Sequence, residues 1–132
     1  MSGRFTESVV EEAALSWLEV QGYAVLHGPV MAVGEPGAER TDPNYRDAVL
    51  DGRLRNALVR LNPGLSPEAL DDAHRKLTLA TAPSLIDRNR MAHRMLVDGV
   101  PIEYSRPDGS VAGGLARLLD FDVPDSNDWL AV

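Results

Sequence analysis

The sequence ends in Trp129-Leu130-Ala131-Val132, an apolar run with strand character that follows Asn127 and Asp128. No turn residue, charge or glycine finishes this element, so its backbone donors and acceptors need a partner strand or a cover. We therefore expect the chain to be the front part of a larger folding unit. The residues by themselves contain no complete catalytic site.

The composition is that of an ordinary globular protein. The chain has 132 residues, of which 44% are hydrophobic and 25% charged, so it can bury the core of one domain or most of one. It has no apolar stretch long enough to span a membrane, and its amino terminus lacks the apolar segment of a signal peptide. We therefore expect a cytoplasmic protein. The absence of cysteine excludes disulfides, thiolate metal sites and cysteine nucleophiles.

The charge argues against free-standing binding of nucleic acid. The formal net charge is -7, whereas such binding depends on Lys and Arg side chains that neutralise phosphates. Lys76 is the only lysine, and the arginines are scattered along the chain. A GC-rich coding sequence explains this preference for arginine over lysine better than a need for phosphate contacts does.

The first predicted element is an amphipathic helix that starts at Thr6 and stops at Gly22. Thr6 is the expected N-cap, with Phe5 as a hydrophobic staple on Val10, and Gly22 supplies the left-handed residue that ends the helix. Its apolar face follows helical spacing and consists of Val10, Ala13, Ala14, Trp17 and Leu18.

A short strand, a loop and three helices are predicted next. Residues 23–26 favour a buried strand, and residues 28–44 are rich in proline and glycine and favour a loop. The three helices are expected to open at Asp42-Pro43, at Ser66-Pro67 and at a capping box of Ser84 with Asp87, and to stop at Asn62-Pro63-Gly64, at Ala82-Pro83 and at Asp98-Gly99. Their expected inward residues are Leu50, Leu54, Ala57, Leu58 and Leu61, then Leu70, Ala73 and Leu77, then Leu85, Ala92, Met95 and Leu96.

The last third of the chain predicts strands. Val100, Ile102 and Tyr104 alternate with polar positions, and Asp108-Gly109 is a hairpin turn signal. A return strand is expected to place Ala116 and Leu118 on one side and Leu115, Arg117, Leu119 and Phe121 on the other. With the terminal strand, the predicted class is α+β, in the order helix, strand, three helices, hairpin, strand.

Two groups of possible metal ligands have simpler explanations. Asp120, Asp122, Asp125 and Asp128 lie close together in sequence, but they lack the glycine and glutamate of a calcium loop, so a solvated turn is the favoured interpretation. His27, His74 and His93 are far apart, and surface or partly packed histidines account for them. No metal ligand is therefore assigned.

Arginines recur at positions that could follow a phosphate backbone. Arg46, Arg53 and Arg60 are spaced by seven residues along one predicted helix, and Arg90 and Arg94 lie on another. The favoured alternative is that their stems cover the core while their charged groups stay in water. The DNA-contacting residues stay unassigned.

Glu7 and Glu11 lie one turn apart in the first helix. The positive end of the helix dipole accounts for Glu7. Glu11 would complete a capping box only if the helix began at Ser8, and a start at Thr6 leaves Glu11 available for another role.

No known catalytic motif is complete. Metal-dependent nucleases of the restriction type need two carboxylates and a lysine on adjacent strands, in the form Pro-Asp followed by an acidic residue, any residue and Lys. Pro107-Asp108 and Pro124-Asp125 supply the first half, but Lys76 precedes both. The chain also lacks a Gly-x-x-x-x-Gly-Lys phosphate loop and a Gly-x-Ser-x-Gly serine turn.

An ordered series of motifs resembles the amino-terminal segment of the restriction subunit of type I restriction-modification enzymes. The resemblance spans nearly all of the chain and rests on residues 5–18 with Gly22-Tyr23, Arg53-Leu54-Arg55-Asn56-Ala57-Leu58 with Leu61-Asn62-Pro63, Gly99-Val100-Pro101-Ile102-Glu103-Tyr104, and Leu119-Asp120-Phe121-Asp122 leading to Asn127-Asp128.

The resemblance implies an incomplete restriction-endonuclease-like domain. Residues 1–132 would form its amino-terminal part, Glu11 would match a supporting glutamate, and the catalytic Asp and Glu-x-Lys strands would follow Val132. The full-length protein would cleave double-stranded DNA with magnesium and ATP, beside methylation and specificity subunits, whereas this chain by itself is expected to be inactive and to hold no cofactor.

A second hypothesis belongs to a different class. The chain could be a complete small acidic module that docks onto another protein through its terminal strand. The coding sequence after Val132 would distinguish the two hypotheses.

Overall fold

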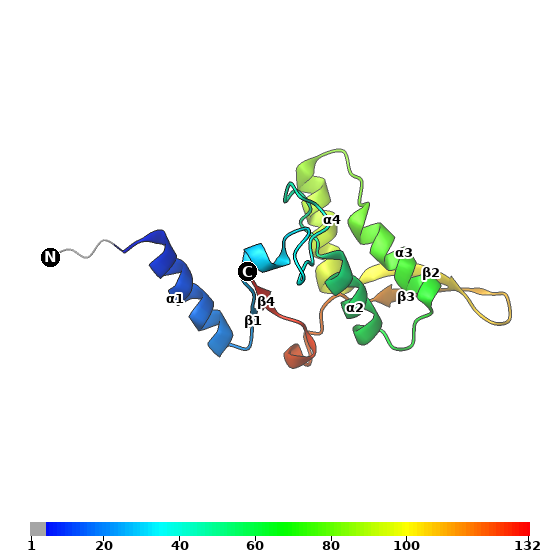
Figure 1. The fold of residues 1–132 in the computed structure, drawn as a ribbon. Helices are drawn as coiled ribbons and strands as arrows, with labels where there is room; N and C mark the ends of the chain where they lie inside the picture. The colour runs from blue at the N-terminus through cyan, green and yellow to red at the C-terminus, as the bar shows by residue number, and fades with distance from the viewer. Residues whose placement is uncertain (1–4) are drawn as a thin grey trace. The chain divides into compact units, whose positions relative to one another are not determined.

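The computed structural model describes residues 5–132 and has the predicted α+β class (Figure 1). Its helices and strands follow the expected order, with two added 3-10 turns, η1 and η2. The elements are α1 (Glu7–Val20), β1 (Ala24–Val25), η1 (Gly28–Met31), α2 (Asp51–Leu61), α3 (Pro67–Thr78), α4 (Leu85–Asp98), β2 (Val100–Ser105), β3 (Val111–Ala116), η2 (Pro124–Ser126) and β4 (Leu130–Ala131).

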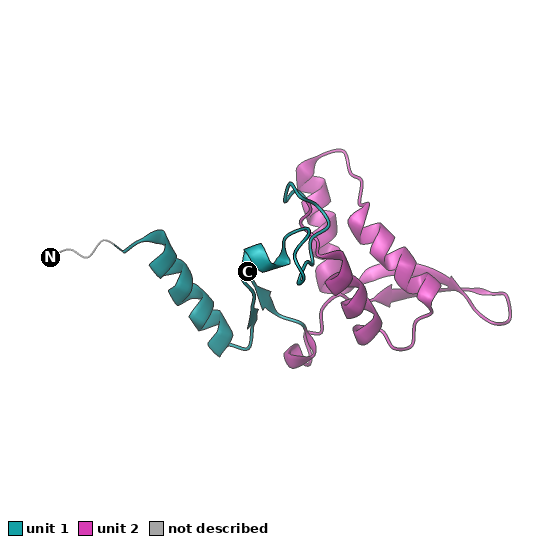
Figure 2. Ribbon diagram, viewed as in Figure 1, with its two compact units in different colours: residues 1–46, 128–132 teal, residues 47–127 magenta. Residues whose placement is uncertain are grey.

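The chain divides into two compact units (Figure 2). Unit 1 consists of residues 1–46 with 128–132, and unit 2 consists of residues 47–127. Unit 1 is thus built from both ends of the chain, and unit 2 is the segment between them. No helix in the described part of the chain is both long and apolar enough to cross a lipid bilayer.

In unit 1, the terminal strand pairs with β1. The two strands are parallel, and Ala24 and Leu26 donate their N–H groups to the carbonyls of Trp129 and Ala131 at 2.8 and 3.0 Å. The Tyr23 and Trp129 rings lie 5.7 Å apart beside this ladder. Both strands are two residues long, so β1 is shorter than the predicted 23–26.

The ends of α1 are as predicted, but its N-cap contact and its burial are not. Thr6 is the N-cap residue, yet its side chain contacts the Ser8 hydroxyl at 3.0 Å instead of a helix N–H, and Phe5 is 83% exposed. Gly22 has a φ of 99° after the helix, as a left-handed stop requires. Of the predicted apolar face, Val10, Ala13, Ala14 and Trp17 are exposed and Leu18 is half-buried, and no residue of α1 is fully buried.

The predicted start of the second helix was wrong by eight residues, since the N-cap is Leu50 and not Asp42. Asp42 was expected to cap it, but α2 begins at Asp51. The Asp42 carboxylate instead accepts the N–H groups of Asn44 and Arg46 at 2.8 and 2.5 Å, so it closes a turn in the loop. The predicted end at Asn62 is confirmed.

The caps of α3 and α4 are confirmed. The Ser66 hydroxyl accepts the N–H of Ala69 at 3.3 Å. The Ser84 hydroxyl accepts the N–H of Asp87 at 3.1 Å and donates to its carboxylate at 2.6 Å. α3 ends at Thr78, before the predicted Ala82-Pro83, and α4 ends at Asp98.

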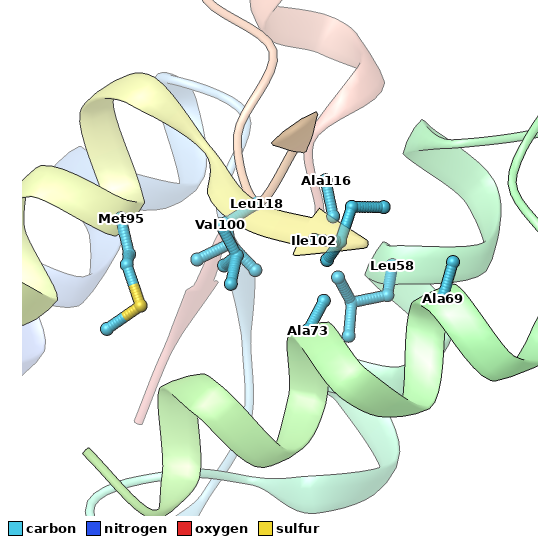
Figure 3. Close-up of a cluster of buried hydrophobic side chains, with 8 residues drawn as sticks. All are labelled: Leu58, Ala69, Ala73, Met95, Val100, Ile102, Ala116 and Leu118. Atoms are coloured by element: carbon cyan, nitrogen blue, oxygen red, sulfur yellow. The ribbon is translucent and has the colours of Figure 1, made fainter. Parts of the chain in front are cut away.

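The core of unit 2 lies between helices and the β2–β3 hairpin. β2 and β3 are antiparallel, and the side chains of Val100 and Ile102 on β2 face Leu58 of α2 and Ala73 of α3 (Figure 3). α3 runs along the hairpin in Figure 1. The buried cluster comprises Leu58, Ala69, Ala73, Met95, Val100, Ile102, Ala116 and Leu118, so the predicted sides of the return strand are correct at Ala116 and Leu118.

Gly99 connects α4 to β2 where no other residue fits easily. Its φ is 92°, and a Cβ there would lie 3.0 Å from the carbonyl oxygen of Ala116. The left-handed conformation and the close backbone both favour glycine. The turn from helix into hairpin therefore depends on Asp98-Gly99, as the sequence predicted.

The return strand ends earlier than predicted. β3 stops at Ala116, and beyond it the backbone groups of Arg117 and Asp120 bond to side chains instead of a strand. The side chain of Asn62 accepts the N–H of Arg117 at 2.7 Å, and the side chain of Asn127 accepts the N–H of Asp120 at 2.8 Å. Leu115 and Phe121 are exposed, at 56% and 61%.

Candidate functional site

Glu11, the predicted supporting residue, lies on the second turn of α1 and is exposed. Its side chain makes no hydrogen bond or ion pair with any of residues 5–132. Across those residues, no three His, Asp or Glu side chains come together in a group that could hold a metal ion. The role of Glu11 therefore stays a prediction.

The nuclease carboxylates and lysine do not converge in the described chain. Lys76 on α3 donates to the carbonyl of Pro101 at 2.7 Å and pairs with Asp72 at 2.8 Å. Asp108 lies in the hairpin turn, where hydrogen bonds from the Ser110 hydroxyl and N–H lower the pKa of its carboxyl. Lys76 thus anchors α3 to β2, and Asp108 closes a turn.

The acidic segment forms a turn, as the favoured interpretation predicted. The Asp120 carboxylate accepts the N–H groups of Asp122 and Val123, each at 3.0 Å. Arg117 lies 3.7 Å from Asp120 and 3.8 Å from Asp122. Asp128 belongs to unit 1. The Asp120 carboxylate therefore holds the backbone of this turn.

The predicted arginine stripe on the second helix does not form. Arg46 precedes α2, and Arg60 donates to the carbonyl of Ser126 at 3.1 Å. On α4, Arg90 lies 3.5 Å from Asp87, and Arg94 lines a hollow of about 560 Å³ together with Asp98. Arg90 therefore has an acidic partner on its own helix, and Arg46, Arg53 and Arg60 do not share one helix.

A polar cluster between α2 and α3 was not predicted from the sequence. His74 Nε2 lies 2.5 Å from Oδ1 of Asp51, and Arg55 donates to Asp51 at 3.0 Å and to Asp71 at 3.2 Å. The His74 side chain is 12% exposed, whereas Asp51 is about half exposed at 52%. These contacts join the first turn of α2 to the middle of α3.

The cluster changes the electrostatics of Asp51. Hydrogen bonds from Arg55 and then from His74 hold the pKa of the Asp51 carboxyl below its usual value of 3.8. The same contacts raise the pKa of Arg55, chiefly through Asp51. Asp51 is therefore a carboxylate at neutral pH and accepts both hydrogen bonds.

A shallow hollow lies beside this cluster. It has a volume of about 280 Å³ and is lined by Leu58, Val59, Leu65, Pro67 and Leu70, with Arg55, Asp71 and His74. A catalytic histidine would need a ring nitrogen free to take a proton. Here Nε2 faces Asp51, and Nδ1 lies 3.4 Å from Arg55, so both nitrogens are engaged. The cluster acts as a helix-to-helix connection.

Asn62 is the other residue whose role the sequence did not show. The sequence placed it in a helix stop and in a motif of the family resemblance, but its amide also donates to the carbonyls of Leu58 and Arg117 at 2.8 and 2.9 Å. Arg117, which Asn62 contacts, is 55 residues further along the chain. The partners of His74 are also distant in sequence: Arg55 is 19 residues away and Asp51 is 23 residues away. No spacing in the local sequence indicates contacts between residues so far apart. The one weak indication was that Asn62, a polar residue, directly follows the apolar stripe of its helix.

The fold and these contacts define an α+β protein whose polar side chains mainly connect its elements. A family model described as the type I restriction enzyme R protein N terminus matches residues 4–132. The chain therefore belongs to this family, and the resemblance noted in the sequence is confirmed. It corresponds to the amino-terminal region of a type I restriction endonuclease subunit.

Two curated relatives agree with this assignment. A Methanocaldococcus jannaschii protein, assigned as the type I restriction enzyme MjaIXP endonuclease subunit, is 30% identical over 122 residues, which are 92% of this chain and 11% of that protein. The type I restriction enzyme HindI endonuclease subunit of Haemophilus influenzae is 30% identical over 126 residues, 96% of this chain and 12% of that protein.

The chain thus spans only 11% and 12% of these relatives. No solved structure matches it. Membership in the family favours the restriction-subunit hypothesis over the complete interaction module.

Proposed function

We propose that this chain forms the amino-terminal part of a nuclease domain with a restriction-endonuclease-like fold. The observation that carries the proposal is the family match over residues 4–132. In this proposal, the catalytic Asp and Glu-x-Lys strands belong to the part of the larger subunit that lies beyond the matched region.

The pairing of β1 with β4 supports this proposal. Parallel sheets are generally covered on both faces, and a sheet of two very short strands is not stable by itself. Within residues 5–132, β1 and β4 pair only with each other. Unit 1 therefore has the form of the first helix and strands of a larger sheet.

The whole subunit is proposed to cleave double-stranded DNA. Magnesium would bind at the carboxylates and activate a water molecule against the phosphate, and ATP would drive a motor region. Methylation and specificity subunits would assemble with it in the cytoplasm. Glu11 would support the metal-binding carboxylates from α1.

A plasmid-nicking assay tests the proposal directly. The purified chain, incubated with supercoiled plasmid and magnesium, is expected to leave the plasmid intact, whereas a full-length subunit assembled with its partners and ATP cleaves it. Magnesium-dependent nicking that follows the purified chain through successive columns and stops with EDTA would overturn the proposal.

Glu11 is tested in the full-length subunit. Glu11→Gln is expected to reduce DNA cleavage about tenfold or more while ATP hydrolysis is unchanged, because only the metal site loses a supporting carboxylate. Glu12→Gln is the matched control, since Glu12 is an exposed neighbour on the same helix. Equal cleavage by the two variants would remove Glu11 from the site.

A further inference from the structure

His27 lies at the end of unit 1 where both of its strands finish. β1 and β4 are parallel, so their carboxyl ends meet at one edge. His27 follows Leu26, whose N–H donates to the carbonyl of Ala131 at 3.0 Å. A Cβ on Gly28 would lie 3.5 Å from the Val132 side chain, and Figure 1 shows the end of the chain beside η1. His27 therefore lies next to the end of β4.

The supporting glutamate proposed above lies at the same end of unit 1. α1 packs against β1 and runs in the opposite direction, with the short turn of residues 21–23 between them (Figure 1). At a rise of about 1.5 Å per helical residue, Glu11 lies about 14 Å back along α1 from Val20. At about 3.3 Å per strand residue, His27 lies about 10 Å beyond Ala24. The two residues are therefore at similar heights above the turn.

The imidazole ring of His27 is available for a contact. His27 is exposed, and its side chain makes no hydrogen bond or ion pair with any of residues 5–132. His74 differs in this respect, because both of its ring nitrogens are engaged in the cluster between α2 and α3. The turn that carries His27 is anchored, since η1 begins at the next residue and ends at Met31, which is buried. An exposed ring on an anchored turn is suited to binding a ligand.

The chemistry of the proposed nuclease site decides what an imidazole would bind there. Magnesium prefers oxygen ligands such as carboxylates, phosphate oxygens and water, whereas imidazole suits zinc, copper, iron and nickel. A phosphodiester has negatively charged oxygens that accept hydrogen bonds from imidazole N–H groups. His27 is therefore better matched to a phosphate of the DNA than to the metal ion.

We propose that His27 contacts the DNA at the nuclease site by donating a ring N–H to an oxygen of the phosphate that is cleaved. This inference rests on the proposed function, because it uses catalytic strands in the part of the subunit beyond the matched region. The hydrogen bond holds the phosphate in position and transfers no proton. The turn after β1 thus supplies a substrate contact, beside the support for the metal site from Glu11 on α1.

Cleavage by the full-length subunit, assembled with its partner subunits, magnesium and ATP, tests this contact. His27→Ala should reduce the rate of plasmid cleavage about tenfold or more, because the phosphate loses a positioning hydrogen bond. His27→Gln should retain more activity than His27→Ala, because its amide can still donate a hydrogen bond. His93→Ala is the matched control and should cleave normally, since His93 is exposed on α4 in unit 2.

Two further measurements separate a phosphate contact from other roles. The magnesium concentration that gives half-maximal cleavage should be unchanged in His27→Ala, whereas loss of a metal ligand would raise it. With calcium in place of magnesium and without ATP, the His27→Ala subunit should bind a short labelled DNA duplex about threefold more weakly, as expected for the loss of one hydrogen bond. ATP hydrolysis and the unfolding midpoint should stay at the parent values, because the exposed ring makes no contact within the described chain.

The possible failures are distinguishable. If the parent assembly cleaves DNA and Glu11→Gln does not, but His27→Ala cleaves at the rate of His93→Ala, this inference is overturned and the proposed function stands. A raised magnesium requirement in His27→Ala would also overturn it, because His27 would then act on the metal ion. A parent assembly that leaves DNA intact would overturn the proposed function and this inference with it.

Discussion

Asn62 holds two distant parts of unit 2 together through one side chain. It is 7% exposed, and its amide group makes three hydrogen bonds, to the carbonyl of Leu58 and to both backbone groups of Arg117. A buried backbone group that loses its partner costs far more than the net gain of making one hydrogen bond. The end of α2 and the exit of β3 therefore depend on this residue.

Asn62→Ala should destabilise unit 2 by about 1–3 kcal/mol, because it leaves the N–H and carbonyl of Arg117 without their partners in a partly buried site. Urea unfolding followed by circular dichroism measures the change. Asn89→Ala is the control, because Asn89 is exposed on α4 and its loss should stay within about 0.5 kcal/mol. Equal midpoints for the two variants would contradict the assigned role.

At the scale of the elements, α2 and α3 are joined by the contacts of Asp51 with Arg55 and His74. These hydrogen bonds lower the pKa of Asp51 below 3.8 in the folded chain. A carboxyl whose folded pKa is depressed contributes stability that is fully present above its unfolded pKa and is lost as pH falls through its folded pKa. The connection between the helices should therefore weaken in acid.

Asp51→Asn should flatten the acid side of the stability curve, between about pH 5 and pH 3, because the variant has no carboxylate to protonate. Unfolding midpoints measured across this range test the prediction. Because the Asp51 side chain is about half exposed, solvent screening keeps the change in unfolding free energy small. Asp98→Asn, an exposed change on α4, should keep the slope of the parent chain, and an unchanged slope in Asp51→Asn would refute the prediction.

At the scale of the whole molecule, the two units differ in how much apolar surface they bury. The cluster of buried hydrophobic side chains lies entirely within unit 2, whereas the buried residues described in unit 1 are Met31 and Ala131. Buried apolar area is the main favourable term in folding. Unit 1 should therefore open more easily than unit 2.

Hydrogen exchange measures this difference. The amides of Ala24 and Leu26, which donate to β4, should exchange at least about a hundredfold faster than the amide of Ala73 in the core helix of unit 2. Glycine substitution at Ala131 should raise exchange at Ala24 and Leu26 and leave Ala73 unchanged. Equal protection of the two units would show that they unfold together.

Features that depend on near neighbours in sequence were predictable. The caps at Ser66 and Ser84, the stop at Gly22 and the turn at Asp108-Gly109 each involve groups within a few residues, and the structure has all of them. The apolar spacing of α3 likewise identified Ala73 as a core residue. Local geometry suffices for such features because the chain itself places their partners.

Features that depend on competition between distant groups were not predictable. Asp42 followed by proline satisfies the rule for a helix start, but the same carboxylate can close a turn, and here it does. The alternating sequence pattern of the return strand continues past Ala116, but the N–H of Arg117 donates to the Asn62 side chain instead of to a neighbouring strand. The cluster around His74 joins residues from two helices, and no spacing within either helix indicates it.

The sequence by itself determined the α+β order and most helix ends, because periodicity, caps and turns act over a few residues, and its ordered motifs carried the resemblance to the family. Only the tertiary structure decided that β4 returns to pair in parallel with β1, that Asn62 and His74 connect distant elements, and that most of the apolar face of α1 stays exposed. These outcomes depend on which groups meet after the chain has folded back on itself, and contacts of that kind have no fixed spacing in the sequence.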